Sequence, residues 1–131
     1  MGVVVGYVAT AEGEAALGVA VHEARARNLP LVVILSERTS RFGADALGVE
    51  RQAEELRSRF EDEDLRADVR VTTRGHDVAD DIIEAATSSN AELIVIGLRR
   101  RSPVGKLLLG SNAQRILLDA PCPVLAVKPV V

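Results

Sequence analysis

The chain has 131 residues, of which 47% are hydrophobic and 27% charged, a balance typical of one soluble globular domain. Its formal net charge is −3, and it contains no Trp, one Tyr and two Phe, which argues against nucleic-acid binding on stacked aromatic rings and against attraction to anionic membranes. The single cysteine, Cys122, excludes an internal disulfide and a CxxC metal site, and its apolar neighbours favour a small buried side chain over a reactive thiol.

The first residues lack the basic region and the long apolar core of a signal peptide. No apolar run approaches about 18 residues, the length that a membrane-spanning helix needs. The sequence therefore predicts a cytoplasmic protein with one domain over residues 1–131.

Five short runs rich in β-branched residues predict strands, over Val3–Val8, Leu31–Leu35, Ala67–Thr73, Glu92–Gly97 and Pro123–Lys128. Four of them are almost continuously apolar, as in parallel strands that are covered on both faces. The third alternates polar and apolar residues, which predicts a position at the edge of a sheet.

Helical periodicity predicts four helices between these strands, over about residues 11–28, 44–61 and 78–89 and from Ser111 onward. Asp77 is the predicted N-cap of the third helix, and Ser111 and Gln114 have the spacing of a capping box in the fourth. The residues predicted to face the core are Ala16, Leu17, Ala20, Val21 and Ala24, then Ala46, Val49, Ala53, Leu56 and Phe60, then Val78, Ile82, Ile83 and Ala86, and finally Ala113, Ile116 and Leu117.

This alternation of strands and helices predicts an α/β fold, with a parallel sheet, right-handed crossovers and helices on both faces. In such sheets ligands bind beyond the carboxyl ends of the strands, where the strand order reverses. The segments that matter for function are therefore expected after the strands, at residues 9–10, 36–43, 74–77 and 98–110.

The longest of these loops, GLRRRSPVGKLLLGS, places three arginines and a lysine between glycines. It does not match the phosphate loop G-x-x-x-x-G-K-[ST], because Arg100 replaces the first glycine and Leu107 the hydroxyl residue, and GxGxxG is absent. An anion site is still predicted at its ends, since Gly97 lets backbone approach a ligand and Gly110-Ser111 enters a helix whose first amides are unpaired. The alternative is a solvated connection in which Ser111 is a helix cap and the glycines are turn residues.

The segment IVIGLRRRSPVGKLLLGSNAQRILLDAPCPVLAVKP resembles the C-terminal part of the universal stress protein family, and VVVGYVATAEGEAAL and GHDVADDIIEAA extend the resemblance over the whole chain. The resemblance implies an open five-stranded sheet with strand order 3-2-1-4-5, in a Rossmann-like fold of the adenine-nucleotide alpha-hydrolase type. It implies an adenine nucleotide (ATP, ADP or AMP) as ligand and a role in stress response or regulation. It also implies a homodimer that pairs through the C-terminal strand, Pro123–Val131.

Nucleotide-binding members of that family carry G-x2-G-x9-G-[ST] after the fourth strand. Gly97 matches the first glycine, and Gly110 and Ser111 match the end of the motif. The resemblance further implies that adenine meets main chain after the first and second strands. The residues expected to bind the nucleotide are therefore Val8, Ala9, Thr10, Leu35, Gly97, Arg99, Arg100, Gly110, Ser111 and Asn112.

Two positions depart from the family pattern. Arg100 stands where the family has its second glycine, which removes a close backbone approach but adds a guanidinium, and we expect Arg100 to hold the phosphates. Val8 stands where nucleotide-bound members have an acidic residue near the nucleoside and metal, which weakens Mg²⁺ binding. Thr10 keeps a hydroxyl at the matching place and is alternatively the N-cap of the first helix. We therefore expect a looser dependence on Mg²⁺, or a preference for fewer phosphates.

No catalytic set and no metal site are predicted. His22 is expected on the surface of the first helix, and His76 on the loop after the third strand. We therefore predict that the protein is not an enzyme and that any ATP hydrolysis is slow, because nothing obvious orients a water. Two alternatives stay open, a slow ATP hydrolase and a dimeric interaction protein that binds no nucleotide, with the arginines docking an acidic partner.

Overall fold

The structure is a computed structural model that describes residues 1–8, 10–35, 46–72, 77–98 and 109–129. Within these residues, strands and helices alternate as the sequence predicts, and each predicted boundary that falls on a described residue is within one residue of the observed one. The predicted start of the second helix at residue 44 and the predicted end of the third strand at Thr73 lie outside the described residues. The elements are β1 (Val3–Tyr7), α1 (Ala11–Arg27), β2 (Leu31–Leu35), α2 (Ala46–Asp62), β3 (Ala67–Val71), α3 (Val78–Ser88), β4 (Leu93–Gly97), α4 (Ser111–Asp119) and β5 (Val124–Val127).

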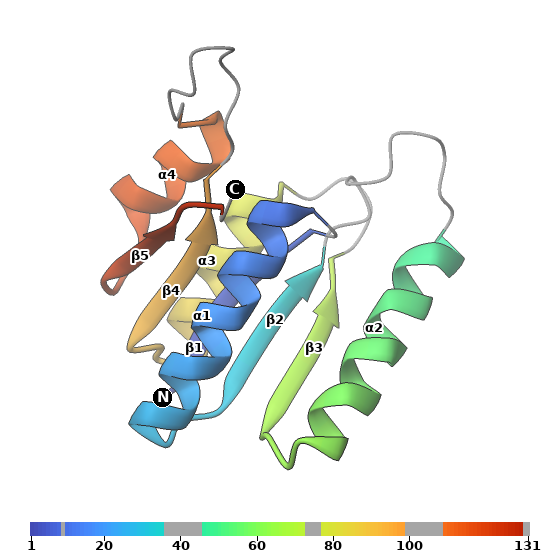
Figure 1. The fold of residues 1–131 in the computed structure, drawn as a ribbon. Coiled ribbons are helices and arrows are strands. Elements are labelled where there is room, and N and C mark those ends of the chain that lie inside the picture. The colour runs from blue at the N-terminus through green and yellow to red at the C-terminus, as the bar shows by residue number, and fades with distance from the viewer. Residues whose placement is uncertain (9, 36–45, 73–76, 99–108, 130–131) are drawn as a thin grey trace.

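The strands form one parallel sheet in the order β3-β2-β1-β4-β5, which confirms the predicted fold (Figure 1). The central strand β1 lies between β2 and β4, and Val3 is in register with Leu31 on one side and Leu93 on the other. β3 lies at one edge, as its alternating sequence predicts, and β5 lies at the other. The strand order thus reverses between β1 and β4.

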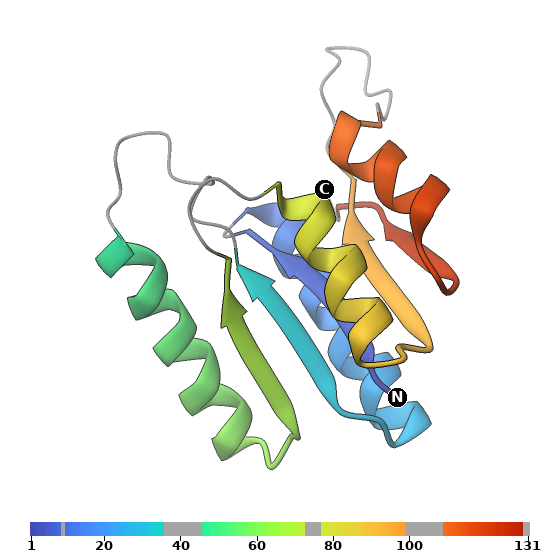
Figure 2. The same cartoon turned by 180° about the vertical axis from the view of Figure 1, so that it is seen from behind.

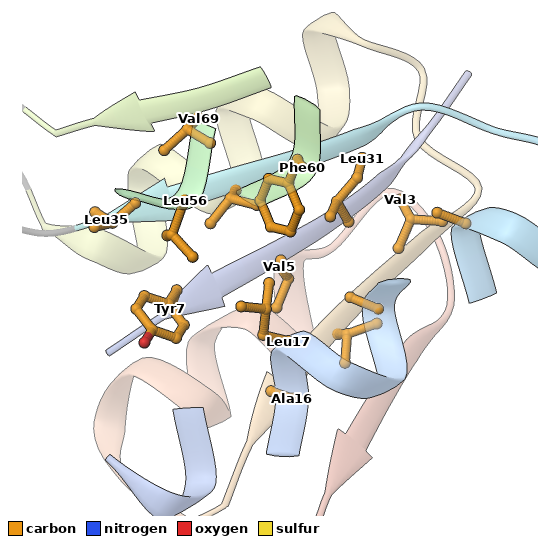
Figure 3. Close-up of a cluster of buried hydrophobic side chains, with 14 of the residues drawn as sticks. Val3, Val5, Tyr7, Ala16, Leu17, Leu31, Leu35, Leu56, Phe60 and Val69 are labelled. Atoms are coloured by element: carbon orange, nitrogen blue, oxygen red, sulfur yellow. The ribbon is translucent and has the colours of Figure 1, made fainter. Parts of the chain in front are cut away.

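Helices α1 and α2 cover one face of the sheet, and α3 and α4 cover the other (Figures 1 and 2). Successive side chains of a strand point to opposite faces, so Val3, Val5 and Tyr7 pack towards α1 and α2 (Figure 3), while Val4 packs towards α3 and α4. A strand covered on both faces must be apolar at every position, which explains the continuous apolar runs.

The starts of α1 and α3 are capped by side chains. Thr10 Oγ1 accepts a hydrogen bond from the Gly13 amide at 3.2 Å, which confirms the N-cap interpretation of Thr10. Asp77 Oδ1 accepts one from the Ala79 amide at 3.4 Å, which confirms the predicted cap of α3. In both cases the side chain satisfies an amide that has no partner within the helix.

The predicted capping box of α4 is wrong. Gly110, not Ser111, is the N-cap, and its carbonyl accepts from the Gln114 amide at 3.0 Å. The Gln114 side-chain amide donates instead to the Leu109 carbonyl at 3.4 Å. Because the helix begins with Ser111 as its first residue, the hydroxyl is one position too late for the reciprocal pair of hydrogen bonds that defines the box.

The predicted core is confirmed at most positions, but Leu117 is an error, since it is 43% exposed. α4 lies over an edge of the sheet, so only Ile116 of this helix is buried. The side chain of Ala46 lies outside the described residues. Cys122 is half-buried, and so are four predicted core residues, Val21, Val78, Ile83 and Ala113. Burial raises the pKa of the Cys122 thiol.

Candidate functional site

The carboxyl ends of β1 and β4 are neighbours at the point where the strand order reverses, which is where a ligand is expected in this type of sheet. The structure brings the predicted residues Val8 and Thr10 to the end of β1, and Gly97 to the end of β4. Three further predicted residues, Ala9, Arg99 and Arg100, lie outside the described residues, as does His76.

Two glycines hold the first turn of α1 against these strand ends. A Cβ on Gly13 would lie 1.7 Å from the Val8 carbonyl oxygen, and a Cβ on Gly97 would lie 2.4 Å from the Glu12 carbonyl oxygen. Neither separation is possible between real atoms, so backbone meets backbone at both places. The predicted reason for Gly97 was approach to a ligand, and the structure adds a second reason, since the turn of α1 itself lies there.

Sequence reasoning missed Gly13. The signal was available, because a glycine within the first turn of an otherwise alanine-rich helix opposes helix propensity. Its partner, however, is the end of the preceding strand, and their separation depends on how closely α1 packs on the sheet. The contact therefore holds the first turn of α1 against the Val8 carbonyl at the end of β1.

Tyr7 and Glu14 form a second link between β1 and α1. The Tyr7 hydroxyl donates a hydrogen bond to Glu14 Oε1. Figure 3 shows the Tyr7 ring at the end of β1, with its hydroxyl directed away from the apolar cluster. Burial, followed by this hydrogen bond and the negative charge of Glu14, raises the pKa of Tyr7 to about 12. The phenol is therefore neutral at physiological pH and is a fixed donor to the first turn of α1.

Leu35, a predicted site residue, has partners within the fold. Its side chain is buried in the core on the face of α1 and α2, and its carbonyl accepts a hydrogen bond from the Thr72 amide at 2.8 Å.

The start of α4 is open to solvent. Gly110, Ser111 and Asn112 are all exposed, and nothing lies within 4 Å of the position that a Cβ on Gly110 would take. Gly110 has an extended backbone and no side chain that could cap the helix. The amides of the first turn therefore present the positive end of the helix dipole without a capping oxygen from the N-cap residue, an arrangement that favours an anion.

Arg115, one turn into α4, was also missed by sequence reasoning. Its Nη1 donates to Asp77 Oδ2 at 3.2 Å, its Nη2 donates to Asp80 Oδ1, and its Nε lies 4.0 Å from Asp119 Oδ2. Arg115 thus joins α4 to the first turn of α3. The partners on α3 are 35 and 38 residues away in sequence, so no local pattern signals the contact.

Other predicted features bear on what the site can do. Among the residues that the structure describes, no group of three His, Cys, Asp or Glu side chains could hold a metal ion. His22 is exposed on α1, as predicted. In the described ranges, every helix is too short or too polar to span a bilayer.

The chain is similar to known proteins over nearly its whole length. The family model described as the universal stress protein family matches residues 1–128. A universal stress protein of Mycolicibacterium smegmatis is 39% identical over 127 residues, which are 97% of each chain. Among solved structures, a universal stress protein from Archaeoglobus fulgidus is similar with a TM-score of 0.80 and 33% identity, covering 98% of both chains. A universal stress protein from the same organism in complex with dAMP is similar with a TM-score of 0.75 and 27% identity, also covering 98% of both chains.

Proposed function

We propose that this chain, which belongs to the universal stress protein family, binds an adenine nucleotide at the carboxyl ends of β1 and β4 and acts as a nucleotide-responsive regulator in a stress response. The observation that carries the proposal is the dAMP complex of a relative that aligns over 98% of both chains. The nucleotide would be held by the predicted residues Val8, Ala9, Thr10, Leu35, Gly97, Arg99, Arg100, Gly110, Ser111 and Asn112.

The described part of the site supports this role through its main chain. The phosphate would lie at the first turn of α4, where Gly110 leaves the amides uncapped and open to solvent. The nucleoside would lie between that turn and the end of β1, where Gly13 packs against the Val8 carbonyl. Val8 supplies no carboxylate oxygen for Mg²⁺, so we expect AMP and dAMP to bind with little dependence on the metal.

Calorimetric titration with AMP, dAMP, ADP and ATP, each with and without Mg²⁺, tests the proposal. We expect heat of binding for AMP and dAMP at millimolar concentration or below, and little change when Mg²⁺ is added. The absence of any heat or thermal shift at millimolar nucleotide would contradict nucleotide binding. It would favour the alternative of an interaction protein.

The variant Gly110→Asp should disturb phosphate binding at the start of α4 without destabilising the helix. The new Cβ enters open space, and aspartate is a favoured N-cap in the backbone conformation that Gly110 has. The carboxylate should therefore leave the protein as stable as before, yet occupy the amides and repel a phosphate. We expect affinity for AMP to fall at least about tenfold, as follows from two like charges about 4 Å apart in a medium less polar than water.

Two matched variants control this experiment. Gly110→Asn caps the same amides without charge, so its affinity for AMP should lie between those of the wild type and Gly110→Asp. Gly18→Asp adds the same charge at an exposed glycine of α1 with nothing within 4 Å, and its affinity should equal that of the wild type. If Gly110→Asp binds AMP as tightly as Gly18→Asp, the phosphate does not lie at the start of α4.

We also propose that the bound nucleotide is a signal and not a substrate. Incubation with ATP should release phosphate no faster than the uncatalysed control. Steady turnover that disappears in Ser111→Ala would instead favour the slow hydrolase.

The edges of the sheet favour self-association through β5, the dimer that the family resemblance implies. The Pro123 and Val127 carbonyls accept hydrogen bonds from β4, so by alternation the backbone groups of Val124 and Ala126 point outward. The strand is apolar, and Leu125 is 37% exposed. Natural edge strands usually carry charges or coverage that prevent such pairing.

The opposite edge has that protection. β3 carries the exposed ion pair of Asp68 and Arg70. In addition, Arg57 Nη2 donates to the Val69 carbonyl at 2.7 Å, which covers an outward-facing group of the strand. The contrast between the two edges favours a second copy of the chain as the partner of β5.

Replacement of one outward amide by proline tests this pairing. Ala126→Pro removes a donor that faces away from β4, so the sheet within the protomer should remain intact. Val71→Pro is the matched control, because its amide faces outward from β3. Sedimentation equilibrium should show a dimer for the wild type and Val71→Pro and a monomer for Ala126→Pro. A dimer in all three proteins would contradict pairing through β5.

A further inference from the structure

α4 carries the proposed phosphate site, yet it is weakly packed. Of its nine residues only Ile116 is buried, and Ala113 is half-buried against the same apolar cluster. One buried side chain restrains the distance of a helix from the sheet, but it does not by itself fix how the helix axis is directed. A second restraint is needed to set the direction in which the first-turn amides point.

Arg115 supplies a restraint of this kind. It lies four residues after Ser111 and reaches from α4 to both Asp77 and Asp80 on α3, which lies beside α4 on the same face of the sheet (Figure 2). A guanidinium is planar and presents its donors in a fixed fork, so contacts to two carboxylates restrain its orientation as well as its distance. Within α4, the Asp119 carboxylate lies 4.0 Å from Nε of the same side chain and adds a third, weaker charge contact.

The restraint ends on a structured partner. Asp77 Oδ2 accepts from Arg115, and its Oδ1 accepts from the Ala79 amide as the N-cap of α3. Helix α3 in turn buries Ala79, Ile82, Ala85 and Ala86 against the sheet. Arg115 therefore ties the poorly packed helix to the start of a well-packed one.

We propose that Arg115 is a positioning residue for the nucleotide site: through Asp77 and Asp80 it holds the N-terminus of α4 in the orientation that presents its amides to a phosphate. The inference rests on the proposed function, because the phosphate is placed at α4. Arg115 acts through the helix and not by contact with the ligand, since its charge is already shared among carboxylates. Hydrogen bonds from fixed amides depend on orientation, so a small reorientation of α4 weakens them.

The first measurement is hydrogen exchange of the free protein, which requires no ligand. Arg115→Ala should increase exchange of α4 amides about threefold to tenfold, as expected for the loss of two exposed ion pairs, and leave β1 and β4 unchanged. Arg115→Lys should restore part of the protection, because an ammonium keeps the charge but lacks the fork. In the wild type, raising NaCl from about 0.05 M to about 0.5 M should weaken protection of α4 by screening, and Arg115→Ala should show no such salt effect.

The second measurement is affinity for AMP. Arg115→Ala should weaken binding about threefold to tenfold, by the same loss of two exposed ion pairs, and Arg115→Lys should recover part of that loss. Arg70→Ala is the matched control, since Arg70 forms an exposed ion pair with Asp68 on β3, at the far edge of the sheet. It should bind AMP like the wild type.

The two measurements separate the possible failures. Unchanged α4 exchange in Arg115→Ala overturns the positioning role, whether or not the wild type binds AMP. Increased exchange with wild-type affinity also overturns it, because the site would then not depend on the direction of α4. A wild type that binds no AMP contradicts the proposed function, and with it the assignment of Arg115 to a nucleotide site, even if Arg115 still orders α4.

Discussion

Replacement of Gly13 by alanine adds only one methyl group, yet it should clearly lower the free energy of unfolding. In Gly13→Ala the new Cβ would be 1.7 Å from the Val8 carbonyl oxygen and 2.8 Å from its carbon. Real Cβ contacts are not shorter than 3.0 Å, so one backbone must retreat by at least 1.3 Å, the difference between 3.0 and 1.7 Å. The obstacle is main chain and has no other rotamer to adopt.

Neither backbone can retreat without loss. α1 buries Ala16, Leu17, Ala20 and Ala24 against the sheet, and Val8 directly continues β1. Overpacking of a rigid site costs about 1–3 kcal/mol, and a backbone obstacle belongs at the upper end. The gain of about 1 kcal/mol from replacing a helical glycine by alanine offsets part of it. We expect a net loss of about 2 kcal/mol in the free energy of unfolding, a fall in Tm of about 6–10 °C for a chain of this length.

Gly18→Ala is the control within the same helix. Its Cβ meets nothing within 4 Å, so only the gain in helix propensity remains, about 1 kcal/mol of stabilisation. Urea unfolding followed by far-UV circular dichroism measures both variants against the wild type. Equal stability of Gly13→Ala and Gly18→Ala would refute the close approach of α1 to the end of β1.

Three further predictions concern single side chains near the same strand end. Tyr7→Phe should remove a loss of stability at alkaline pH. The phenol has a pKa of 10.0 when exposed and about 12 in the folded protein, so the wild type keeps its stability below pH 10. Between pH 10 and 12 thermal melts should show the free energy of unfolding of the wild type falling by up to about 2–3 kcal/mol, and that of Tyr7→Phe should not show this fall. Val8→Asp should strengthen ATP binding in the presence of Mg²⁺ more than in its absence, because it adds a carboxylate oxygen for the metal; an equal calorimetric effect in both conditions would contradict this. Gly6→Ala should lower the free energy of unfolding by less than about 1 kcal/mol, because the only close contact of its Cβ is the terminal methyl group of Ile82, at 2.7 Å. Urea unfolding should show that the added change Ile82→Val, which removes this methyl group, recovers the lost stability.

Sequence patterns predicted the strands and helices well because these elements depend on residues that are close together in the sequence. The continuous apolar sequence of β1 and β4 has few explanations other than a strand covered on both faces. The alternation in β3 places it at an edge, and Asp77 caps α3 through an amide two residues away. The strand order itself came from the family resemblance and not from these patterns.

The features that were not predicted depend on how the helices and the sheet pack together. Leu117 has the spacing of a core residue, but α4 covers an edge of the sheet and has room to bury only Ile116. Arg115 finds its partners on another helix. The steric need for Gly13 follows from the distance between α1 and β1, which is a property of the packed layers. Arg100, the departure from the family motif that matters most for phosphate binding, lies outside the described residues, and its contact with phosphate stays a prediction.

The two halves of the proposed site are held by different forces. At the ends of β1 and β4, Gly13 and Gly97 let the backbone of α1 touch that of the strand ends, and such contacts do not respond to salt. At α4, one buried residue and the exposed ion pairs of Arg115 hold the helix, and ion pairs of this kind are screened. Ionic strength should therefore loosen the phosphate half while the nucleoside half keeps its shape. It follows that affinity for AMP should fall with salt more steeply than affinity for adenosine. If the site were equally rigid on both sides and neutral at α4, salt would change neither affinity.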